Sequence, residues 1–265
     1  MKVKKDVRSK RLRGLVKLCV KKDLADKSSI RTTIWRTMEK LGVTRLPKPV
    51  FGRIPNFVGA EVAAKRLSLE PEFINARAIK VNPDSPQRAV RYLTLLNEKM
   101  LVMPSPKLKE GFILLDPHKI SSNLYFKAST IRGAFKYGIK CSLKELPPID
   151  LIVTGCVAVS IEGVRVGKGG GFSELEYAIL RELNLINEKT PILTTVHEVQ
   201  IVDWAPKEIY DLVVDAIVTP QRVIRVENKI KRPKGIFWNL INEEMIRSMP
   251  ILSELKSLKI SNRNF

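Results

Sequence analysis

Residues 150–183 read DLIVTGCVAVSIEGVRVGKGGGFSELEYAILREL and contain three patterns in succession. Leu151–Thr154 is a short apolar run, which is typical of a strand buried on both faces. Gly163–Gly171 holds five glycines, so its backbone carries little side-chain bulk. Ser173–Leu183 has apolar residues at helical spacing. The succession predicts a strand, a glycine-rich loop and a helix, which together form a repeating unit of α/β folds.

The same alternation extends along the rest of the chain. Spacing and end signals predict helices over Lys27–Leu41 (with Ser28 or Ser29 as N-cap), Ala60–Ser68, Gln87–Asn97 and Pro206–Leu212. Short apolar runs predict strands over Ala76–Val81, Met100–Met103, Val157–Ser160, Val196–Val202 and Ala216–Thr219. Strands that alternate with helices predict a three-layer α/β fold, in which helices flank a mainly parallel sheet.

The length and composition predict one packed domain. With 265 residues, 44% of them hydrophobic, the chain can bury a large core without disulfides. We expect an α/β domain over residues 27–255, between a basic N-terminal extension (1–26) and a C-terminal tail (256–265). Three widely spaced cysteines and two histidines fit neither a disulfide framework nor a zinc site. Because neither a membrane-spanning apolar run nor a secretory signal is recognisable, we expect a cytoplasmic protein without membrane contact.

The positive charge is concentrated near the N-terminus. The chain has a formal net charge of +20, and residues 1–48 contribute +12 of it. A basic segment attracts polyanions, so RNA is one candidate partner for residues 1–26. The alternative is a solvated, lysine-rich surface without a partner, and the charge pattern leaves both interpretations open.

The glycine-rich loop has the features of a phosphate-binding loop. Backbone N–H groups of glycines can approach an anion closely, and the helix that follows offers its unpaired N–H groups to the same anion. Arg165 and Lys168 add formal positive charge. The loop matches neither a Walker A motif nor a dinucleotide-binding fingerprint. From glycine content alone, a flexible surface loop is the alternative.

Acidic residues follow this loop and recur later in the chain. Glu174 and Glu176 fall in the first turn of the predicted helix, where acidic side chains commonly complement the helix dipole. A carboxylate beside bound phosphates is also a typical Mg²⁺ ligand, and Glu174 is nearer to the loop. Asp211 and Asp215 precede a predicted strand. Either can supply a second carboxylate, or both are solvated acids.

Several motifs together resemble the 5-formyltetrahydrofolate cyclo-ligase family. They are KSSIR at 27–31, DLIVTGCVAV at 150–159, RVGKGGGF at 165–172 and PKEIYDLVVDAIVT at 206–219. Further motifs are similar to the methenyltetrahydrofolate synthetase domain-containing branch: RIPNFVGAEVAA at 53–64, KVNPDSPQR at 80–88, GFSELEYA at 171–178 and RPKGIFW at 232–238. The resemblance covers about residues 27–255.

The resemblance implies a fold, a reaction and two cofactors. The fold is that of cyclo-ligases, which is similar to the NagB, RpiA and CoA-transferase folds. In the reaction, ATP phosphorylates the formyl oxygen of 5-formyltetrahydrofolate. The neighbouring folate nitrogen then attacks the activated carbon, and phosphate leaves to give 5,10-methenyltetrahydrofolate. ATP and Mg²⁺ are the implied cofactors, and such chemistry depends on positioning and charge stabilisation rather than on a histidine base.

The resemblance also implies roles for individual residues. Lys27 and Arg31, which share one helix face, would bind ATP phosphates and act in catalysis with Arg165. Phe172 would pack near the folate. The triphosphate would be held by Arg165, Gly167, Lys168, Gly169, Gly170 and Gly171, and the metal ion by Glu174 and Asp211.

The sequence departs from the family pattern on the substrate side. Phe172-Ser173-Glu174 stands where the family has Tyr-Tyr-Asp, and no glutamate is recognised in residues 80–90, where Gln87 or Arg88 stands instead. We therefore expect Gln87 to contact the substrate. A second hypothesis follows from these departures: a catalytically altered domain that binds nucleotide, RNA or both.

Overall fold

The computed structural model describes residues 26–227 and 230–261, and the side chains of residues 26–227 and 230–258. Its centre is an eight-stranded sheet with the strand order β11-β10-β8-β5-β1-β2-β3-β4. The strands are β1 (Ala78–Val81), β2 (Met100–Pro104), β3 (Phe112–Leu115), β4 (Ile139–Cys141), β5 (Leu151–Thr154), β8 (Ile192–Thr195), β10 (Ala216–Val218) and β11 (Val223–Arg225). The five central strands are parallel, and β3, β4 and β11 pair antiparallel at the edges. The predicted, mainly parallel sheet is confirmed.

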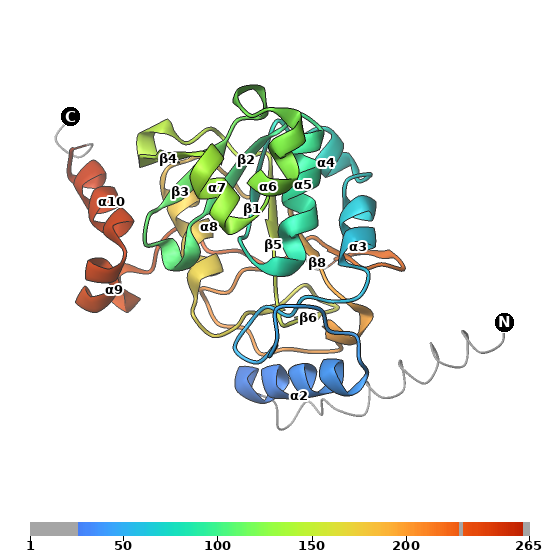
Figure 1. Ribbon diagram of the computed structural model, residues 1–265. Coiled ribbons are helices and arrows are strands. Elements are labelled where there is room, and N and C mark those ends of the chain that lie inside the picture. The colour runs from blue at the N-terminus through green and yellow to red at the C-terminus, as the bar shows by residue number, and fades with distance from the viewer. Residues whose placement is uncertain (1–25, 228–229, 262–265) are drawn as a thin grey trace.

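Helices cover both faces of this sheet (Figure 1). The helices are α2 (Lys27–Lys40), α3 (Ala60–Leu67), α4 (Pro71–Ile74), α5 (Arg88–Leu96), α6 (Tyr125–Ala128), α7 (Ile131–Tyr137), α8 (Phe172–Glu182), α9 (Glu243–Ser248) and α10 (Pro250–Ser261). Along β5, Leu151 and Val153 pack with α3, α5, α6 and α7, whereas Ile152 packs with α8 and α10. The alternation of buried side chains along one strand therefore produces the three-layer fold that the sequence predicts.

A second, smaller sheet supports α2 and the glycine-rich loop. It contains β6 (Ala158–Ser160), β7 (Arg165–Val166) and β9 (Ile201–Val202) in the order β7-β6-β9. Ile30, Ile34 and Met38 of α2 are buried against this sheet in a core of their own. Since β7 ends at Val166, the glycine-rich loop leaves the small sheet directly beside α2, which brings two distant motifs together.

The structure corrects three local predictions. The N-cap of α2 is Asp26 rather than Ser28 or Ser29, because its carboxylate accepts a hydrogen bond from the Ser29 backbone N–H. The strand predicted over Val196–Val202 is displaced, since β8 ends at Thr195 and His197 caps a short 3₁₀ turn before β9. Pro206–Leu212 is not helical, because the Asp211 carboxylate accepts the backbone N–H of Glu208 in a turn.

The C-terminal part of the chain was not foreseen in detail. Helix α10 runs through position 256, where we expected a tail to begin. The β3-β4 hairpin, α6, α7 and α9 were also not predicted.

Within the described ranges, no helix combines the length and the apolar character that a membrane span requires. Of the predicted basic extension (1–26), residues 1–25 lie outside the part of the chain that the structure describes.

Candidate active site

Helix α2 contacts the glycine-rich loop through Arg31. Its Nε donates a hydrogen bond to the Gly167 carbonyl oxygen at 2.8 Å. A Cβ atom at Gly169 would lie only 3.6 Å from the Arg31 guanidinium carbon, and Gly169 has a φ of +106°. The loop therefore passes the guanidinium in a backbone conformation that favours glycine. Residues separated by more than 130 positions, which the sequence predicted to share one site, do lie together.

Lys27 lies one turn earlier on α2 and reaches a different partner. Its Nζ lies 2.5 Å from Oδ2 of Asp211 and 5.7 Å from the centre of the Tyr210 ring. Asp211 is buried, and its carboxylate also accepts the backbone N–H of Glu208. A predicted phosphate-binding cation and a predicted metal-binding carboxylate thus form one ion pair.

Arg165 lies beneath the loop and is buried. One guanidinium nitrogen donates to the Gly155 carbonyl oxygen at 2.6 Å, and another pairs with the Glu174 carboxylate. Burial is the largest single influence on the pKa of Arg165 and lowers it, but the charge and hydrogen bond of Glu174, together with the charges of Cys156 and Glu176, outweigh burial and raise the pKa. The ion pair fixes Glu174 at the start of α8.

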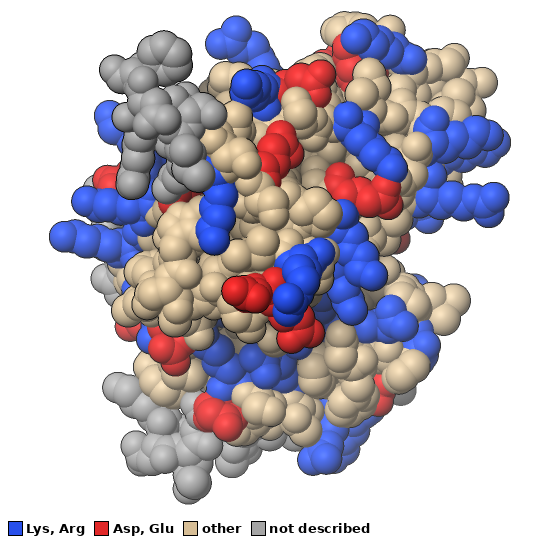
Figure 2. All heavy atoms as spheres, turned by 90° about the vertical axis from the view of Figure 1, so that its left-hand side faces the viewer, with Lys and Arg blue, Asp and Glu red and all other residues tan. Residues whose placement is uncertain are grey.

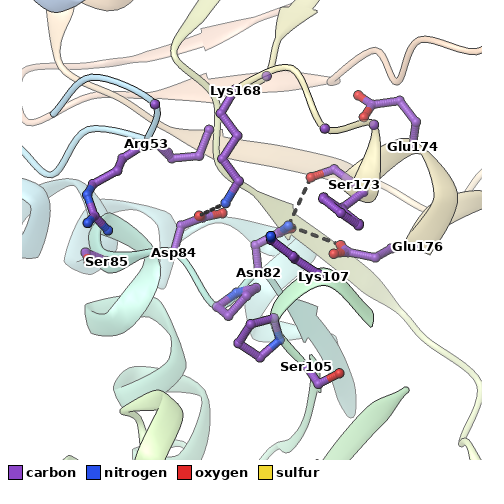
Figure 3. A pocket seen from close by; sticks show the side chains of 18 of the residues that line it. Arg53, Asn82, Asp84, Ser85, Ser105, Lys107, Lys168, Ser173, Glu174 and Glu176 are labelled. Atoms are coloured by element: carbon purple, nitrogen blue, oxygen red, sulfur yellow. Dashed lines mark hydrogen bonds and ion pairs between the residues drawn. The ribbon is translucent and has the colours of Figure 1, made fainter. Parts of the chain in front are cut away.

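A first cavity of about 300 Å³ opens on one side of the glycine-rich loop (Figure 3). Its floor contains Asn82, Ser173 and Glu176, and its lining includes Pro83, Pro106, Ile54 and Phe172. Four cationic side chains also line it: Arg53, Lys107, Arg165 and Lys168. The first cavity thus combines flat apolar surfaces with a polar floor and basic groups.

Glu176, on the floor of the first cavity, belongs to a buried ion pair. Lys80, in the centre of β1, pairs with Glu176 of α8, and both residues are at most 3% exposed. Asn82 donates one hydrogen bond to Glu176 and one to Ser173 (Figure 3). Burial raises the pKa of Glu176, and the neighbouring Lys80 charge opposes that shift. Sequence reasoning missed this pair, although a lysine within a buried strand and a glutamate at a core position of a helix were visible signals.

The structure places Gln87 away from this cavity. Its side chain is fully buried, and its Nε2 donates to Oγ1 of Thr195 at 3.0 Å. Gln87 is not among the described residues that line the first cavity. Asp84 takes this place instead, and its carboxylate lies 3.1 Å from Lys168 Nζ (Figure 3). The segment 80–90 therefore does present a carboxylate, at a position that the sequence interpretation passed over.

A second cavity of about 370 Å³ lies on the other side of the loop. It is lined by Gly169, Gly170, Gly171, Glu174, Leu175, Ala178, Tyr210, Pro233, Gly235, Ile236, Phe237, Leu240, Ile241 and Met245. Gly170, Gly171 and Glu174 line both cavities. Lys27 lies over the ring of Tyr210, which lines the second cavity. The Arg31 guanidinium lies beside Gly169, which also lines it. The loop is therefore a shared wall between two spaces of similar size.

The predicted metal ligands Glu174 and Asp211 both raise the pKa of Tyr210. Burial and the negative charges of Glu208, Asp211 and Glu174 raise the pKa of Tyr210. Both carboxylates are held in ion pairs, and no group of three histidine, cysteine or acidic residues gathers at a metal-binding distance within the described ranges. Two carboxylates fit Mg²⁺ that arrives with phosphate oxygens and water, rather than an ion held by a closed protein cage.

Comparisons with known proteins agree on one family. Residues 23–220 match the 5-formyltetrahydrofolate cyclo-ligase family model. The methenyltetrahydrofolate synthase domain-containing protein of Mus musculus is 40% identical over 234 residues, which cover 87% of this chain and 63% of that protein. The Homo sapiens protein of the same name is 37% identical over 236 residues, which cover 87% and 61%. This chain thus spans less than two thirds of the length of these relatives.

Two further proteins are more distant. The 5-formyltetrahydrofolate cyclo-ligase of Escherichia coli K12 is 33% identical over 87 residues, which cover 32% of this chain and 45% of that protein. The solved structure of Aquifex aeolicus 5,10-methenyltetrahydrofolate synthetase is 19% identical, with a TM-score of 0.49, and the match covers 78% of this chain and 96% of that one.

Proposed function

The chain belongs to the 5-formyltetrahydrofolate cyclo-ligase family, and we propose that it is an ATP- and Mg²⁺-dependent ligase. Its reaction converts 5-formyltetrahydrofolate, or a related folate, to 5,10-methenyltetrahydrofolate with release of ADP and phosphate. One observation carries the proposal: a glycine-rich loop in contact with Arg31 stands between two cavities. A reaction that transfers a phosphoryl group from a nucleotide to a second substrate needs two such adjacent spaces.

The second cavity and its surroundings suit a nucleotide. Helix α8 begins after Gly171, which has no side chain to cap the first N–H groups, so these groups are free to bind phosphate oxygens. Arg31 places a positive charge beside the same loop, and Lys27 places another over the Tyr210 ring, which lines this cavity. Tyr210 and Phe237 provide ring surfaces on which a flat base can lie. The phosphates would therefore meet the loop, and the base would enter the cavity.

Glu174 and Asp211 would hold the magnesium ion together with the nucleotide. When bound, Mg²⁺ neutralises charge on the transferring phosphoryl group. For this to happen, Asp211 and Glu174 must share or leave their present partners, Lys27 and Arg165. Phosphate oxygens can replace Asp211 as the partner of Lys27. The exchange keeps every charge compensated.

The first cavity suits the folate ring. Phe172 and the two prolines Pro83 and Pro106 offer flat surfaces, and the floor offers hydrogen-bonding groups. Because the first cavity shares its wall with the second, the formyl oxygen and the terminal phosphate would meet at Gly170–Gly171. The protein then contributes alignment and positive charge, and the folate nitrogen itself is the nucleophile.

The reaction can be tested directly. The purified chain is incubated with 5-formyltetrahydrofolate, ATP and Mg²⁺, and both the absorbance of the methenyl product and the release of ADP are followed. Lys27→Ala is expected to reduce both signals, whereas Lys40→Ala, at the other end of the same helix, is not. A chain that binds ATP but forms neither product has lost the reaction, and the proposal would then be wrong.

The alternative is a domain that binds nucleotide, RNA or both without this turnover. Its support is the net charge of +12 on residues 1–48, most of which lies outside the described residues. On the face shown in Figure 2, basic side chains are interspersed with acidic ones. If residues 1–26 carry RNA binding, their deletion will abolish RNA retention that weakens with rising salt. Retention that survives the deletion would exclude this role.

A further inference from the structure

The lining of the first cavity includes one member of a buried ion pair, Glu176, to which the proposed reaction assigns no role of its own. Glu176 lies in α8 and Lys80 lies in β1, and the side chains are 4% and 1% exposed. Removing two charges from water costs free energy that their attraction only partly returns. Apolar residues of similar size would fill the same space at no loss of stability. The contribution of this ion pair to folding stability therefore does not explain its presence, and we look for a role in ligand binding.

One oxygen of Glu176 is left available. Oε2 accepts hydrogen bonds from Lys80 and from Asn82, whereas Oε1 has no hydrogen-bond partner among the described residues. Asn82 is itself fixed, because its Oδ1 accepts from Lys80 at 2.9 Å and its amide also donates to Ser173 at 3.0 Å. Figure 3 shows the hydrogen bond between Asn82 and Glu176, both of which line the first cavity. Glu176 thus presents a positioned, unused acceptor to the first cavity.

We propose that Glu176 accepts a hydrogen bond from an N–H group on the pyrimidine edge of the folate ring, and thereby sets the orientation of the ring. This inference rests on the proposed function. The lining of the first cavity also carries the cationic side chains Arg53, Lys107, Arg165 and Lys168. A folate has N–H donors at its ring end, which Glu176 can accept, and carboxylates at its glutamate end, which such cations can bind.

Lys80 holds this acceptor in position. Its Nζ donates hydrogen bonds both to Oε2 of Glu176 and to Oδ1 of Asn82. Lys80 is therefore a positioning residue, and Glu176 is the residue that contacts the ligand.

The double variant Lys80→Met/Glu176→Leu separates folding from recognition. It replaces both charges by apolar side chains of similar volume, a change that is commonly neutral or stabilising. The isosteric Glu176→Gln is the second variant. Its amide oxygen must face the Lys80 and Asn82 donors, so its NH₂ group points into the cavity. There it would face the N–H donor of the folate ring, and no hydrogen bond can form between two donors. Both variants are expected to bind Mg-ATP as the wild type does.

The ligands are 5-formyltetrahydrofolate and its 2-desamino-2-methyl analogue, which lacks the amino donor. Their dissociation constants are measured by calorimetry on the full chain. The wild type is expected to bind the analogue at least about tenfold more weakly, as for loss of a hydrogen bond to a charged group. The double variant is expected to bind the natural ligand about tenfold more weakly and to show no preference between the two ligands. Glu176→Gln is expected to behave in the same way.

The outcomes distinguish the inference from the proposed function. A wild type that binds neither ligand contradicts the proposed function and the inference with it. A wild type that binds and converts 5-formyltetrahydrofolate, with variants that retain its affinity and its preference, overturns the inference alone. If the double variant does not fold, the preference shown by Glu176→Gln decides the question.

Discussion

Lys27 and Asp211, 184 positions apart, form an ion pair of 2.5 Å between α2 and the turn that precedes β10. The residue expected to bind phosphate thus neutralises a residue expected to bind the metal ion. Asp211→Asn removes this charge without changing the size of the side chain. We expect turnover to fall by about a hundredfold, as for loss of one electrostatic contact to a transition state, and the Mg²⁺ concentration for half-maximal activity to rise. Steady-state assays over a range of Mg²⁺ measure both effects.

The matched control for Asp211→Asn is Glu110→Gln, which removes a carboxylate from a surface ion pair with Lys140. Its activity and Mg²⁺ dependence are expected to equal those of the wild type. Equal Mg²⁺ dependence of Asp211→Asn and the wild type would show that Asp211 is not near the ion.

Arg31 and Arg165 are expected to differ in what they support. Arg165 is buried with Glu174, so Arg165→Met leaves a carboxylate without its partner and lowers the free energy of unfolding by about 3 kcal/mol. Among the residues that the structure describes, Arg31 makes one side-chain hydrogen bond, to Gly167, so Arg31→Ala lowers stability by about 1 kcal/mol or less. Turnover of Arg31→Ala is nevertheless expected to fall at least tenfold. Urea unfolding and turnover are measured for both variants, which separates a role in stability from a role in catalysis. Equal losses of stability in Arg165→Met and Arg31→Ala would contradict this division.

Gly169 is expected to tolerate no side chain. Its φ of +106° is strained for other residues, and a Cβ atom would contact the Arg31 guanidinium. Gly169→Ala is expected to cost about 1–2 kcal/mol of stability and to weaken ATP binding. Gly42, with a φ of +64° and open space around it, is the matched control. Gly42→Ala should lower stability without altering the ATP dissociation constant. ATP binding that Gly169→Ala leaves unchanged would argue against phosphate contact with the loop.

Lys107 is expected to recognise the acidic end of a folate. It is an exposed side chain on the lining of the first cavity, and no ion pair involves it within the described ranges. Lys107→Ala is expected to raise KM for 5-formyltetrahydrofolate several-fold, since an exposed charge pair contributes up to about 1 kcal/mol. The effect should vanish with 5-formyltetrahydropteroate, which lacks the glutamate. Lys109→Ala, two positions further and outside the lining, serves as the control.

Cys156 gives the protein a pH dependence at the alkaline end. Burial raises the pKa of its thiol to about 11. The folded state therefore keeps a proton that the unfolded state loses at lower pH. Stability from this group is complete below the ordinary thiol pKa and declines as pH rises toward 11, by up to roughly 1.4 kcal/mol per pH unit. Denaturant unfolding between pH 8 and 10.5 should show this decline, and Cys156→Ala should show a weaker one.

The sequence predicted those parts of the site that depend on local pattern. The glycine-rich loop, α2 with Lys27 and Arg31, and the strand that precedes the loop were all visible in spacing and composition. These features arise from backbone conformation and one-sided burial, which neighbouring residues determine. The three-layer arrangement followed because short apolar strands between helices can be buried only inside a covered sheet.

The remaining parts depend on contacts between distant residues. Lys80 and Glu176 are 96 positions apart, and each is a charged residue in an otherwise apolar pattern. Their burial is explained only by the ion pair that they form in the fold. In segment 80–90, a short 3₁₀ turn directs Asp84 toward the first cavity and buries Gln87 against Thr195. The non-helical course of residues 206–212 follows from the contacts of Asp211 with Lys27 and Glu208. No pattern of neighbouring residues in the sequence indicates these long-range contacts.

The shared wall at Gly170 and Gly171 has a thermodynamic consequence. Because these two glycines line both cavities, an occupant that stiffens the loop from one side would change the free energy of binding on the other. Such coupling is reciprocal: the factor by which the first ligand alters the affinity for the second is also the factor by which the second alters the affinity for the first. The order in which the two ligands arrive then changes the rates along the path but not the free energy of the ternary complex.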